Sequence, residues 1–367
     1  MKKVKPTFLR LSALLLLLAT VLTLGACGGE SLPPNETESN GESQTVTVTD
    51  VESNTETSLE SVTVDDGTYR ERILVVTDVH NNHDSTRQWY RIPNDERMAR
   101  FVEDVNDEYR RDPFSMILFL GDISLDHWAG GSKGCWINSG VSYSKKFIDE
   151  WKPLLPDVPM FFLPGNHEQF SEERWNSFVG NGRKGYVVVE DYLMILWDAY
   201  SGDIEPSKHL TATYTPMDVA WVRSVMDAHP DKRVILLSHH FDETKELEAS
   251  EAAAEGVETS ADLVSDERVV FLFAGHKHTS AVKTLGDAFD GKKLIFCGNY
   301  SYYNEDKVVD GEMIAIPGEH MWGFRELILT ESRASTNYIV PENTVFINGV
   351  ETRYRYTMQN GVIVHFD

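Results

Sequence analysis

The sequence predicts an α/β domain in which short buried strands alternate with amphipathic helices. Apolar runs rich in β-branched and aromatic residues recur along the chain, and each is too short for a typical core helix. Segments between these runs carry apolar residues at helical spacing. The last part, residues 323–367, alternates in strand fashion and contains Asn-Gly pairs typical of hairpin turns. We therefore expect one sheet-rich domain with helices packed against it.

The N-terminus has the composition of a secretory signal peptide. A basic start precedes an apolar stretch, residues 11–24, that is shorter than the ~20 apolar residues a membrane span needs. Leu24-Gly25-Ala26-Cys27 resembles the lipobox of bacterial lipoproteins. The resemblance implies cleavage before Cys27 and acylation of its thiol, which would anchor the chain by lipid outside the cytoplasm, on the bacterial cell membrane. An uncleaved signal anchor with an incidental cysteine is the alternative.

Residues 1–26 are thus predicted to be a lipoprotein signal peptide, and residues 27–66 a disordered acidic tether. The tether is rich in Ser, Thr, Glu and Asn and has too few large apolar residues to offset the entropy of ordering. Two stretches inside it, 45–51 and 61–64, alternate like strands, and one of them could pair onto the domain. Residues 67–367 are long enough for a single large domain with a substantial core.

The charge of the chain excludes several classes of partner. The formal net charge is −24, and removing four basic leader residues and ten acidic tether residues leaves −18 on the domain. Such a surface repels nucleic-acid backbones and anionic membranes, so we expect no nucleic-acid binding by bulk charge. A negative substrate would need a local positive source such as bound metal ions. Cys135 and Cys297 leave a disulfide open, and no protein partner is inferred.

The expected helices are assigned from apolar spacing and capping signals. Apolar residues in 94–111 form one face, and Arg97 is placed outside it. Residues 145–151 form a short helix, 215–227 a helix with Thr215 as N-cap, and 246–257 a solvated helix beside the site.

The expected strands fall into two groups. Five of them run into polar motifs, and these are residues 72–77, 115–120, 158–163, 233–237 and 269–274. The others are 186–189, 191–197, 292–297, 326–330, 337–340, 344–347, 354–358 and 362–366, with turns at Asn348-Gly349 and Asn360-Gly361.

Groups that can bind metal follow the five strands of the first group. The motifs are Asp78-Val79-His80, Gly121-Asp122, Gly165-Asn166-His167-Glu168, His239-His240 and Gly275-His276-Lys277-His278. Ligands in open α/β sheets gather beyond the carboxyl ends of strands, so these loops are expected to meet in one crevice.

The spacing inside the motifs indicates how the side chains could converge. In an extended His276-Lys277-His278 the two imidazoles point to the same side, and Gly275 permits the turn that ends the strand. Adjacent residues of an extended chain point to opposite faces, so only one of His239 and His240 is expected to reach the shared site.

In this order and spacing the motifs resemble those of the calcineurin-like metallophosphoesterase family. The resemblance covers residues 72–278. It implies a four-layer αββα sandwich, with two mixed β-sheets flanked by helices. It also implies hydrolysis of phosphate esters, either phosphomonoesters or phosphodiesters, at a dinuclear metal centre with a bridging hydroxide.

The resemblance assigns roles to individual residues. Two divalent metals share the carboxylate of Asp122. One metal is completed by Asp78, His80 and His278, and the other by Asn166, His239 and His276. His239 is chosen over His240 because the family's ligand is the first histidine after the strand. His167 lies near the leaving oxygen, where it donates a proton or stabilises the transition state.

Residue types limit the metals and the subfamily. The N/O ligands suit Mn, Fe, Zn, Ni or Co, and no motif contains a cysteine. Leu125 stands where purple acid phosphatases have a tyrosine ligand, so no purple ferric centre is expected. The alternative function is a catalytically silent surface module that binds metal or phosphorylated ligands.

A further set of residues is weighed for substrate contact. His83, Asp126 and His127 follow the first two motifs, and solvated loop positions are the preferred interpretation for all three. His240 is also a candidate contact. Tyr300, Tyr302, Tyr303 and Trp322 could line a substrate wall, although core packing is the preferred interpretation.

Overall fold

The computed structural model describes residues 68–82, 93–127, 141–200, 212–301, 306–309, 312–315, 322–341, 345–347, 350–352 and 356–366. The predicted signal peptide and tether, His83, Cys135, Tyr302, Tyr303 and the Asn348-Gly349 turn lie outside these ranges. Within the described part, no helix is long and apolar enough to cross a membrane.

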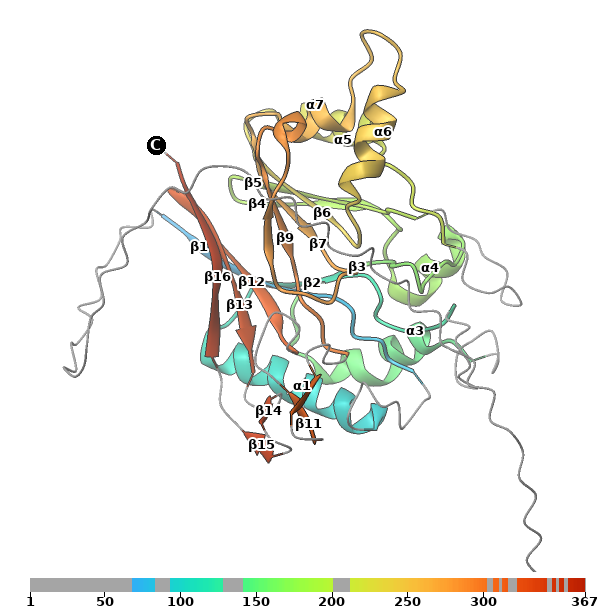
Figure 1. Ribbon diagram of the computed structural model, residues 1–367, viewed down its shortest axis with the longest axis vertical. Coiled ribbons are helices and arrows are strands. Elements are labelled where there is room, and N and C mark those ends of the chain that lie inside the picture. Colours follow the sequence, from blue (N-terminus) through green and yellow to red (C-terminus); the bar gives the residue numbers. More distant parts are fainter. Residues whose placement is uncertain are drawn as a thin grey trace, which may run out of the picture. The chain divides into compact units, whose positions relative to one another are not determined.

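The first sheet has six strands and is mixed (Figure 1). Its strand order is β16-β13-β12-β1-β2-β3. Three neighbours run parallel, namely β1 (Arg70–Val76), β2 (Met116–Leu120) and β3 (Met160–Leu163). The other three pair antiparallel, namely β12 (Phe324–Thr330), β13 (Arg333–Val340) and β16 (Tyr356–His365).

The second sheet is also six-stranded and mixed, with the order β4-β5-β6-β7-β9-β8. Its four parallel strands are β5 (Tyr192–Trp197), β6 (Arg233–Ser238), β7 (Val269–Ala274) and β9 (Lys293–Phe296). The antiparallel edges are β4 (Gly185–Val189) and β8 (Val282–Thr284). Two short hairpins complete the strands, β10 (Asp306–Val309) with β11 (Glu312–Ala315) and β14 (Val345–Ile347) with β15 (Val350–Thr352).

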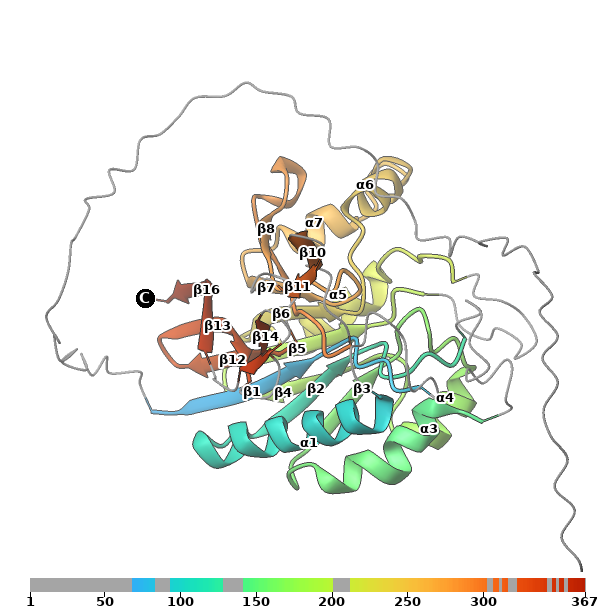
Figure 2. The same cartoon turned by 60° about the horizontal axis from the view of Figure 1, so that its bottom comes forward.

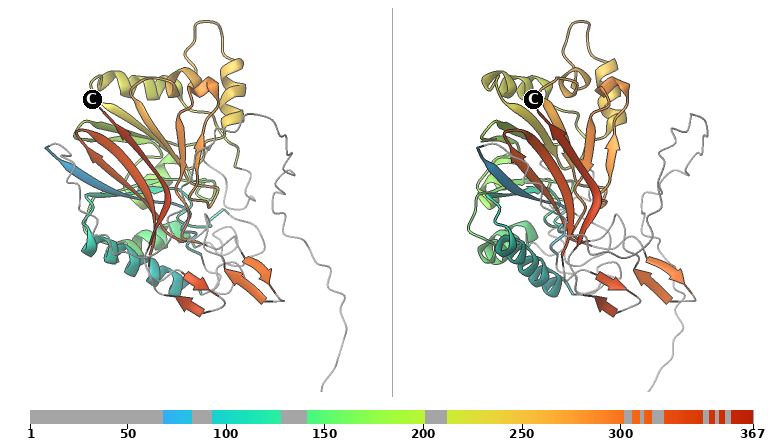
Figure 3. Two further views of the ribbon diagram at one scale, coloured as in Figure 1. Left: turned by 60° about the vertical axis from the view of Figure 1, so that its left-hand side comes forward. Right: turned by 90° about the vertical axis from the view of Figure 1, so that its left-hand side faces the viewer.

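Alternation along the strands places successive side chains in different layers. Val75 on β1 joins the apolar layer between the sheets, which also holds Leu118 and Phe271. Leu74 points the other way, into an outer core, and Val234 on β6 lies in a second outer core. Helices cover these outer cores on opposite sides of the paired sheets (Figures 2 and 3). The predicted four-layer sandwich with two mixed sheets is confirmed.

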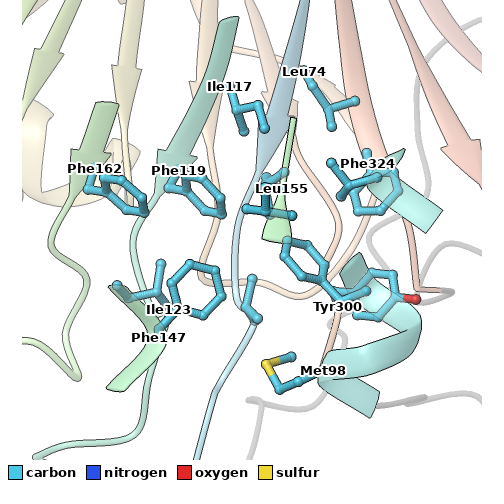
Figure 4. Packing of buried hydrophobic residues seen from close by; sticks show 14 of the residues in the cluster. Leu74, Met98, Ile117, Phe119, Ile123, Phe147, Leu155, Phe162, Tyr300 and Phe324 are labelled. Atoms are coloured by element: carbon cyan, nitrogen blue, oxygen red, sulfur yellow. The ribbon is translucent and has the colours of Figure 1, made fainter. Parts of the chain in front are cut away.

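The outer core beneath α1 (Asn94–Arg111) is aromatic (Figure 4). Phe119 and Phe162 lie on neighbouring strands, and their rings stack with centroids 4.4 Å apart. Tyr300 and Trp322 are fully buried in the same core, and their rings stack 5.3 Å apart. The interpretation of these two aromatic residues as core therefore agrees with the structure.

The structure contains a helix near each predicted one, but most of the observed limits differ from the predicted limits. Helix α1 has the predicted limits. The second predicted helix is divided into α3 (Tyr143–Lys146), a π-helical turn (Phe147–Trp151) and a 3-10 turn (Lys152–Leu154). Helix α4 (Glu172–Val179), helix α7 (Ser260–Val264) and a 3-10 turn (Asp287–Phe289) were not expected.

Two helix predictions were wrong about where the helix begins. Helix α5 (Val219–Ala228) is capped by Asp218, whose carboxylate accepts a hydrogen bond from Trp221 N. Thr215 is no N-cap, because its backbone N–H donates to Ala199 O at 2.8 Å. Helix α6 (Glu243–Glu251) begins before Glu246, and that residue is fully buried rather than solvated.

One turn prediction was also wrong. Asn360 and Gly361 lie inside β16, which runs through them without a break. The register of the β13–β16 pair shifts here, because one residue separates Thr336 from Tyr338 on β13 whereas three separate their partners Met358 and Val362 on β16. Asn360 and Gly361 therefore lie in a β-bulge of β16. A Cβ on Gly361 would lie 2.9 Å from Thr336 O, so glycine at this position serves close approach instead of a turn.

Candidate metal centre

The five predicted motifs meet at the carboxyl ends of β1, β2, β3, β6 and β7. Backbone hydrogen bonds join their loops directly. Asp78 N donates to Gly121 O at 3.1 Å, and His80 N donates to Asp122 O at 2.9 Å. In the second sheet, Gly275 N donates to His239 O at 2.9 Å. Strands of both sheets therefore contribute to one site, as expected of crevices beyond the strand ends.

The site residues share an unusual backbone conformation. Five of the seven non-glycine residues with positive φ in the described part belong to the motifs: Asp78, His80, Asp122, His276 and His278, with φ between 51° and 65°. L-residues pay about 1 kcal/mol or more in this left-handed region, and Asp and His tolerate it better than most. Strain of this kind gathers where function fixes the geometry.

The extended geometry expected for His276-Lys277-His278 was wrong. Both histidines adopt left-handed backbone angles, and Lys277 N donates to Gly275 O at 2.7 Å, which closes a tight turn. The two imidazoles consequently belong to different clusters of possible ligands. The assignment of His276 and His278 to two different ions stays a prediction, and in the structure a turn, not strand alternation, separates the two imidazoles.

The first cluster contains Asp78, His80 and His278. Asp78 Oδ2 accepts hydrogen bonds from Thr77 Oγ1 at 2.7 Å and from His276 N at 2.9 Å. The carboxylate is thereby oriented so that Oδ1 lies 3.0 Å from His278 Nε2 and 3.7 Å from His80 Nε2. Three groups that can donate a lone pair converge on one spot.

Asp122 lies at the centre of the histidines. Its Oδ2 atom is 3.2 Å from His239 Nε2, 3.6 Å from His80 Nε2 and 3.7 Å from His167 Nε2. Its other oxygen, Oδ1, accepts a hydrogen bond from His167 N at 3.0 Å. One buried carboxylate oxygen therefore faces ligands of both clusters, which is the position a shared ligand requires.

Asn166 completes the second cluster, which also contains Asp122, His239 and His276. Asn166 Oδ1 lies 3.1 Å from His239 Nε2 and 2.9 Å from His276 Nδ1. His239 Nδ1 donates to Leu120 O at 2.7 Å, because a carbonyl can only accept. That bond turns His239 Nε2 toward the cluster, in the way a backbone carbonyl often orients a metal-binding histidine.

The electrostatics of the site favour added positive charge. Burial raises the pKa of Asp78 and Asp122, but the surrounding imidazoles outweigh it and hold both pKa values below their usual range. Burial likewise opposes charge on His239, yet Asp122 and Asp78 raise its pKa to about 10. The two carboxylates thus stabilise positive charge on a fully buried imidazole. A cation bound at the same place would be stabilised by the same two negative charges.

Three other histidines of the site have lowered pKa values, whereas His80, whose burial opposes charge, has its pKa raised by Asp122 and Asp78. Burial lowers the pKa of His167 to about 4, and it also lowers the pKa values of His276 and His278. Neutral imidazoles offer a lone pair to a metal. Within the described residues, His167 Nδ1 has no hydrogen-bond partner although it is buried.

The donor set fits divalent metal ions. Two clusters of imidazole and carboxylate groups lie side by side, and an amide oxygen completes the second of them. A third group of possible ligands, formed by His80, Asp122 and His167, lies between them and shares a residue with each. Mixed N/O donors without thiolate suit Mn, Fe, Zn, Ni or Co. The hydrogen bonds to Asp78 and His239 described above fix the orientation of these ligands, as functional metal sites require.

Glu168 holds the site together, a role that its place in the motif did not reveal. Its Oε2 accepts hydrogen bonds from Asp122 N at 2.8 Å and Gly165 N at 2.9 Å. Its Oε1 accepts from Ser124 N at 2.8 Å. The carboxylate therefore ties the β2 loop to the β3 loop. Burial, followed by the nearby Asp122 charge, raises the pKa of Glu168 to about 8.

Arg97 was placed on the polar face of α1, which was wrong. Its side chain is fully buried and donates to the carbonyl oxygens of Val79, His80 and Tyr300. Those carbonyls belong to the β1 loop and to the segment after β9. Through Arg97, helix α1 thereby holds the backbone of the motif Asp78-Val79-His80 in place. Nothing in the apolar periodicity could signal this, because the partners are backbone atoms distant in sequence.

The glycines of the motifs allow the loops to approach closely. A Cβ on Gly165 would lie 2.5 Å from Asp122 N, and one on Gly121 would lie 2.6 Å from His239 Nδ1. Neither position can accept a larger residue unless the candidate ligands move.

The loop residues weighed as substrate contacts have different surroundings from those expected. Asp126 and His127 are fully buried, so the solvated interpretation was wrong. Asp126 accepts hydrogen bonds from Tyr143 N at 2.6 Å and Ser144 N at 2.9 Å at the start of α3. His127 Nδ1 accepts from Gln169 N at 3.0 Å. Both hold neighbouring loops in place.

His240 lies beside the site, with its ring stacked on His276 at a centroid distance of 4.2 Å. Its Nδ1 is 2.8 Å from Tyr200 Oη, a partner that the sequence did not indicate. Burial lowers the pKa of His240 to about 3. His240 therefore contributes a neutral wall adjoining the second cluster.

Elsewhere, Cys297 is buried and carries a free thiol.

Comparison with known proteins identifies the family. The model of the calcineurin-like phosphoesterase family matches residues 71–280 and so contains every motif. The chain belongs to this family.

A curated relative is the probable glycerophosphodiester phosphodiesterase GpdQ of Arcobacter nitrofigilis, which is 25% identical over 173 residues. That match covers 44% of this chain and 56% of the relative. The chain thus spans little more than half the length of that relative.

Similar solved structures include PhoD, with a TM-score of 0.48 and 7% identity over 81% of this chain and 70% of PhoD. Another is GAP50 of Plasmodium, with a TM-score of 0.39 and 12% identity over 76% of this chain and 89% of GAP50. A single mutant of Vps29 from Entamoeba histolytica has a TM-score of 0.34 and 14% identity, over 81% of this chain and 99% of Vps29.

Proposed function

We propose that this chain hydrolyses phosphate esters at a dinuclear metal centre whose two ions share Asp122. The observation that carries the proposal is the position of Asp122 Oδ2, which lies within 3.2–3.7 Å of His239, His80 and His167. Asp78, His80 and His278 would complete one ion, and Asn166, His239 and His276 the other. Two such ions, when bound, clamp a phosphate and lower the pKa of water.

The chain's own groups have separate tasks in this proposal. The carboxylates of Asp78 and Asp122 supply the negative charge that retains cations in a buried site. The turn at Gly275 and the tie through Glu168 fix the relative positions of the two clusters. His167 lies with His80 and Asp122 in a third group of possible ligands. Because the other seven residues complete both proposed ions, we assign His167 to the leaving oxygen.

Phosphodiesters and phosphomonoesters are both candidate substrates. The similarity to a glycerophosphodiester phosphodiesterase supports a diester, while the chemistry of the donor set serves either class. A catalytically silent binding module would tolerate loss of ligands. Here each predicted ligand is present and most are buried, which supports catalysis.

Hydrolysis of p-nitrophenyl phosphate and bis-p-nitrophenyl phosphate tests the proposal. After chelation, the protein is expected to lose activity toward whichever ester it cleaves, and Mn, Zn, Ni or Fe is expected to restore it. The comparison of the two esters assigns the protein to monoesterases or diesterases. Full activity after exhaustive chelation, or no turnover with any metal, would reject the enzyme proposed here.

We also propose that Cys27 anchors the chain by lipid outside the cytoplasm. The support is the sequence around Leu24-Gly25-Ala26-Cys27, which lies outside the described residues. The variant Cys27→Ala is expected to lose the mass of the lipid and to keep its signal peptide, because the thiol is both the acylation site and part of the cleavage signal. Intact mass measures both effects. An unchanged mass, apart from the substitution itself, would contradict the anchor.

A further inference from the structure

Three of the four outer edges of the six-stranded sheets carry a feature that discourages pairing with a further strand. At β3, the amide of Asn181 occupies both outward backbone groups of Phe162, accepting from its N–H at 3.1 Å and donating to its C=O at 2.8 Å. Strand β8 has only three residues and includes Lys283. Strand β16 contains the bulge at Asn360 and Gly361. The fourth edge, β4, has none of these features.

Strand β4 is a regular edge strand with open backbone groups. All five of its residues pair with β5 without a register shift. The two-residue turn that follows makes Val189 and Tyr192 a hydrogen-bonded pair. Alternation then turns the N–H and C=O groups of Tyr186 and Val188 away from β5. On that open side, no residue that the structure describes forms a backbone hydrogen bond to them.

The side chains on the outer face of β4 are exposed. Tyr186 is 48% and Val188 is 41% exposed, and neither belongs to the outer core that helix α5 covers. Lys184 and Glu190 flank them at a spacing of two residues, and both are exposed. Lys184 Nζ pairs with Asp218 Oδ2 at 2.9 Å, a surface pair of the kind that contributes little. The face therefore presents a cation, an aromatic ring, an aliphatic group and an anion in that order.

This order of side chains is complementary to itself. When β4 pairs antiparallel with β4 of a second copy about Val187, Tyr186 lies opposite Val188 of that copy, and Lys184 lies near its Glu190. The two-fold axis repeats both pairs. In this register Tyr186 and Val188 of the second copy form a hydrogen-bonded pair, which uses the backbone groups that point away from β5. Aromatic–aliphatic pairs and opposite charges across strands both stabilise a sheet.

We propose that β4 is an interface between two copies of this chain, which join their second sheets through antiparallel pairing about Val187. The chain's own tether is the competing strand, because residues 45–51 alternate like a strand. However, residues 27–66 contain no basic residue to lie near Glu190, whereas a second copy supplies both charges. The contact is one strand wide on each side, so the dimer is expected to be weak.

Cysteine cross-linking in cells that produce the full chain tests the register. Val187 faces itself across the two-fold axis in a non-hydrogen-bonded pair, with Cα atoms about 4.5 Å apart and within disulfide range. Val187→Cys is therefore expected to form a disulfide-linked dimer under mild oxidation. Val188→Cys is the matched control, because that position is more exposed but lies diagonally about 7–8 Å from its own copy, which is too far.

The wild-type chain, which keeps its own three cysteines, sets the background of this measurement. No dimer above that background in Val187→Cys, or equal cross-linking of Val187→Cys and Val188→Cys, would overturn the proposed register.

Charge reversal tests the ends of the interface. In the Val187→Cys background, Lys184→Glu or Glu190→Lys alone places like charges near each other at both ends. Each is expected to lower the initial rate of disulfide formation about fivefold. The two reversals together restore opposite charges, and they are expected to return the rate to within about twofold of the parent. If the combined variant stayed as slow as the single ones, the charge pairing would be rejected.

Sedimentation velocity of the purified full chain in detergent tests the dimer without cysteine chemistry. At about 0.15 M salt the screening length is about 8 Å, which limits the repulsion between two domains of charge −18. A monomer–dimer equilibrium that shifts with protein concentration is expected, with or without chelator. The result is independent of the proposed function, because neither metal nor hydrolysis is needed. A monomer at every concentration would contradict the interface, and it is the outcome expected if the tether covers β4.

Discussion

Asp122→Asn is expected to lower kcat about a thousandfold, which corresponds to about 4 kcal/mol in the activation barrier. The asparagine has the same shape and keeps an oxygen for the hydrogen bond from His167 N. It removes the negative charge that faces His80, His167 and His239 within 3.7 Å. Loss of activity would therefore report loss of a shared anionic ligand. Steady-state kinetics on the better p-nitrophenyl ester measures it.

Asp126→Asn is the matched control for that variant. Asp126 is buried on the same loop, but its carboxylate bonds to the start of α3 instead of facing the imidazoles. The control is expected to lose stability, since an amide would present N–H groups to backbone donors. It should nevertheless retain kcat within about tenfold. Equal losses of kcat in both variants would show that Asp122 acts through loop structure alone.

His167→Ala is expected to reduce hydrolysis in proportion to the basicity of the leaving group. For an alkyl phosphate the expected loss is about 10²- to 10³-fold, the range typical of a missing general acid. For a p-nitrophenyl ester the loss should be about tenfold or less, because p-nitrophenolate leaves without a proton. The physical basis is the position of His167 Nε2, 3.7 Å from Asp122 Oδ2, together with its proposed role at the leaving oxygen instead of on a metal ion.

His127→Gln separates proton donation from loop positioning. His127 bonds to the backbone of Gln169 and lies next to His167 O, so its loss disturbs the same loop. Because His127→Gln only disturbs the position of the loop, it is expected to lower activity on alkyl and p-nitrophenyl esters by the same factor. If His167→Ala also lowered both activities by the same factor, the assignment of His167 as general acid would be rejected.

The strands and the site could be predicted from the sequence because their signals are local. Each apolar run ends at a motif, and parallel strands bring those ends together. One cluster contains Asp78 and His278, and another contains Asp122 and His276. Both lie beyond the strand ends, where the positions of the motifs predicted a crevice. Helix α1 was also predicted with its observed limits, since its apolar face repeats along the whole helix.

Features that depend on tertiary contacts could not be read in this way. The positive φ angles of His276 and His278 follow from loops bonded to one another, whereas the sequence pattern suggested extended backbone. Arg97 is buried because three carbonyl groups accept its hydrogen bonds, although periodicity placed it outward. Asn360 and Gly361 have the composition of a turn but form a bulge within β16, which pairs with β13 on both sides of it. In each case a long-range partner overrides the local preference.

The number of metal ions bound per chain at full activity tests the dinuclear centre most directly. Purified protein is stripped with chelator, titrated with Mn or Zn, and assayed for bound metal by mass spectrometry and for ester hydrolysis in the same samples. We predict that activity rises to saturation at two ions per chain, and that Asp122→Asn fails to retain the pair. Full activity at one ion per chain, or with no ion bound, would contradict a centre in which Asp122 joins two metals.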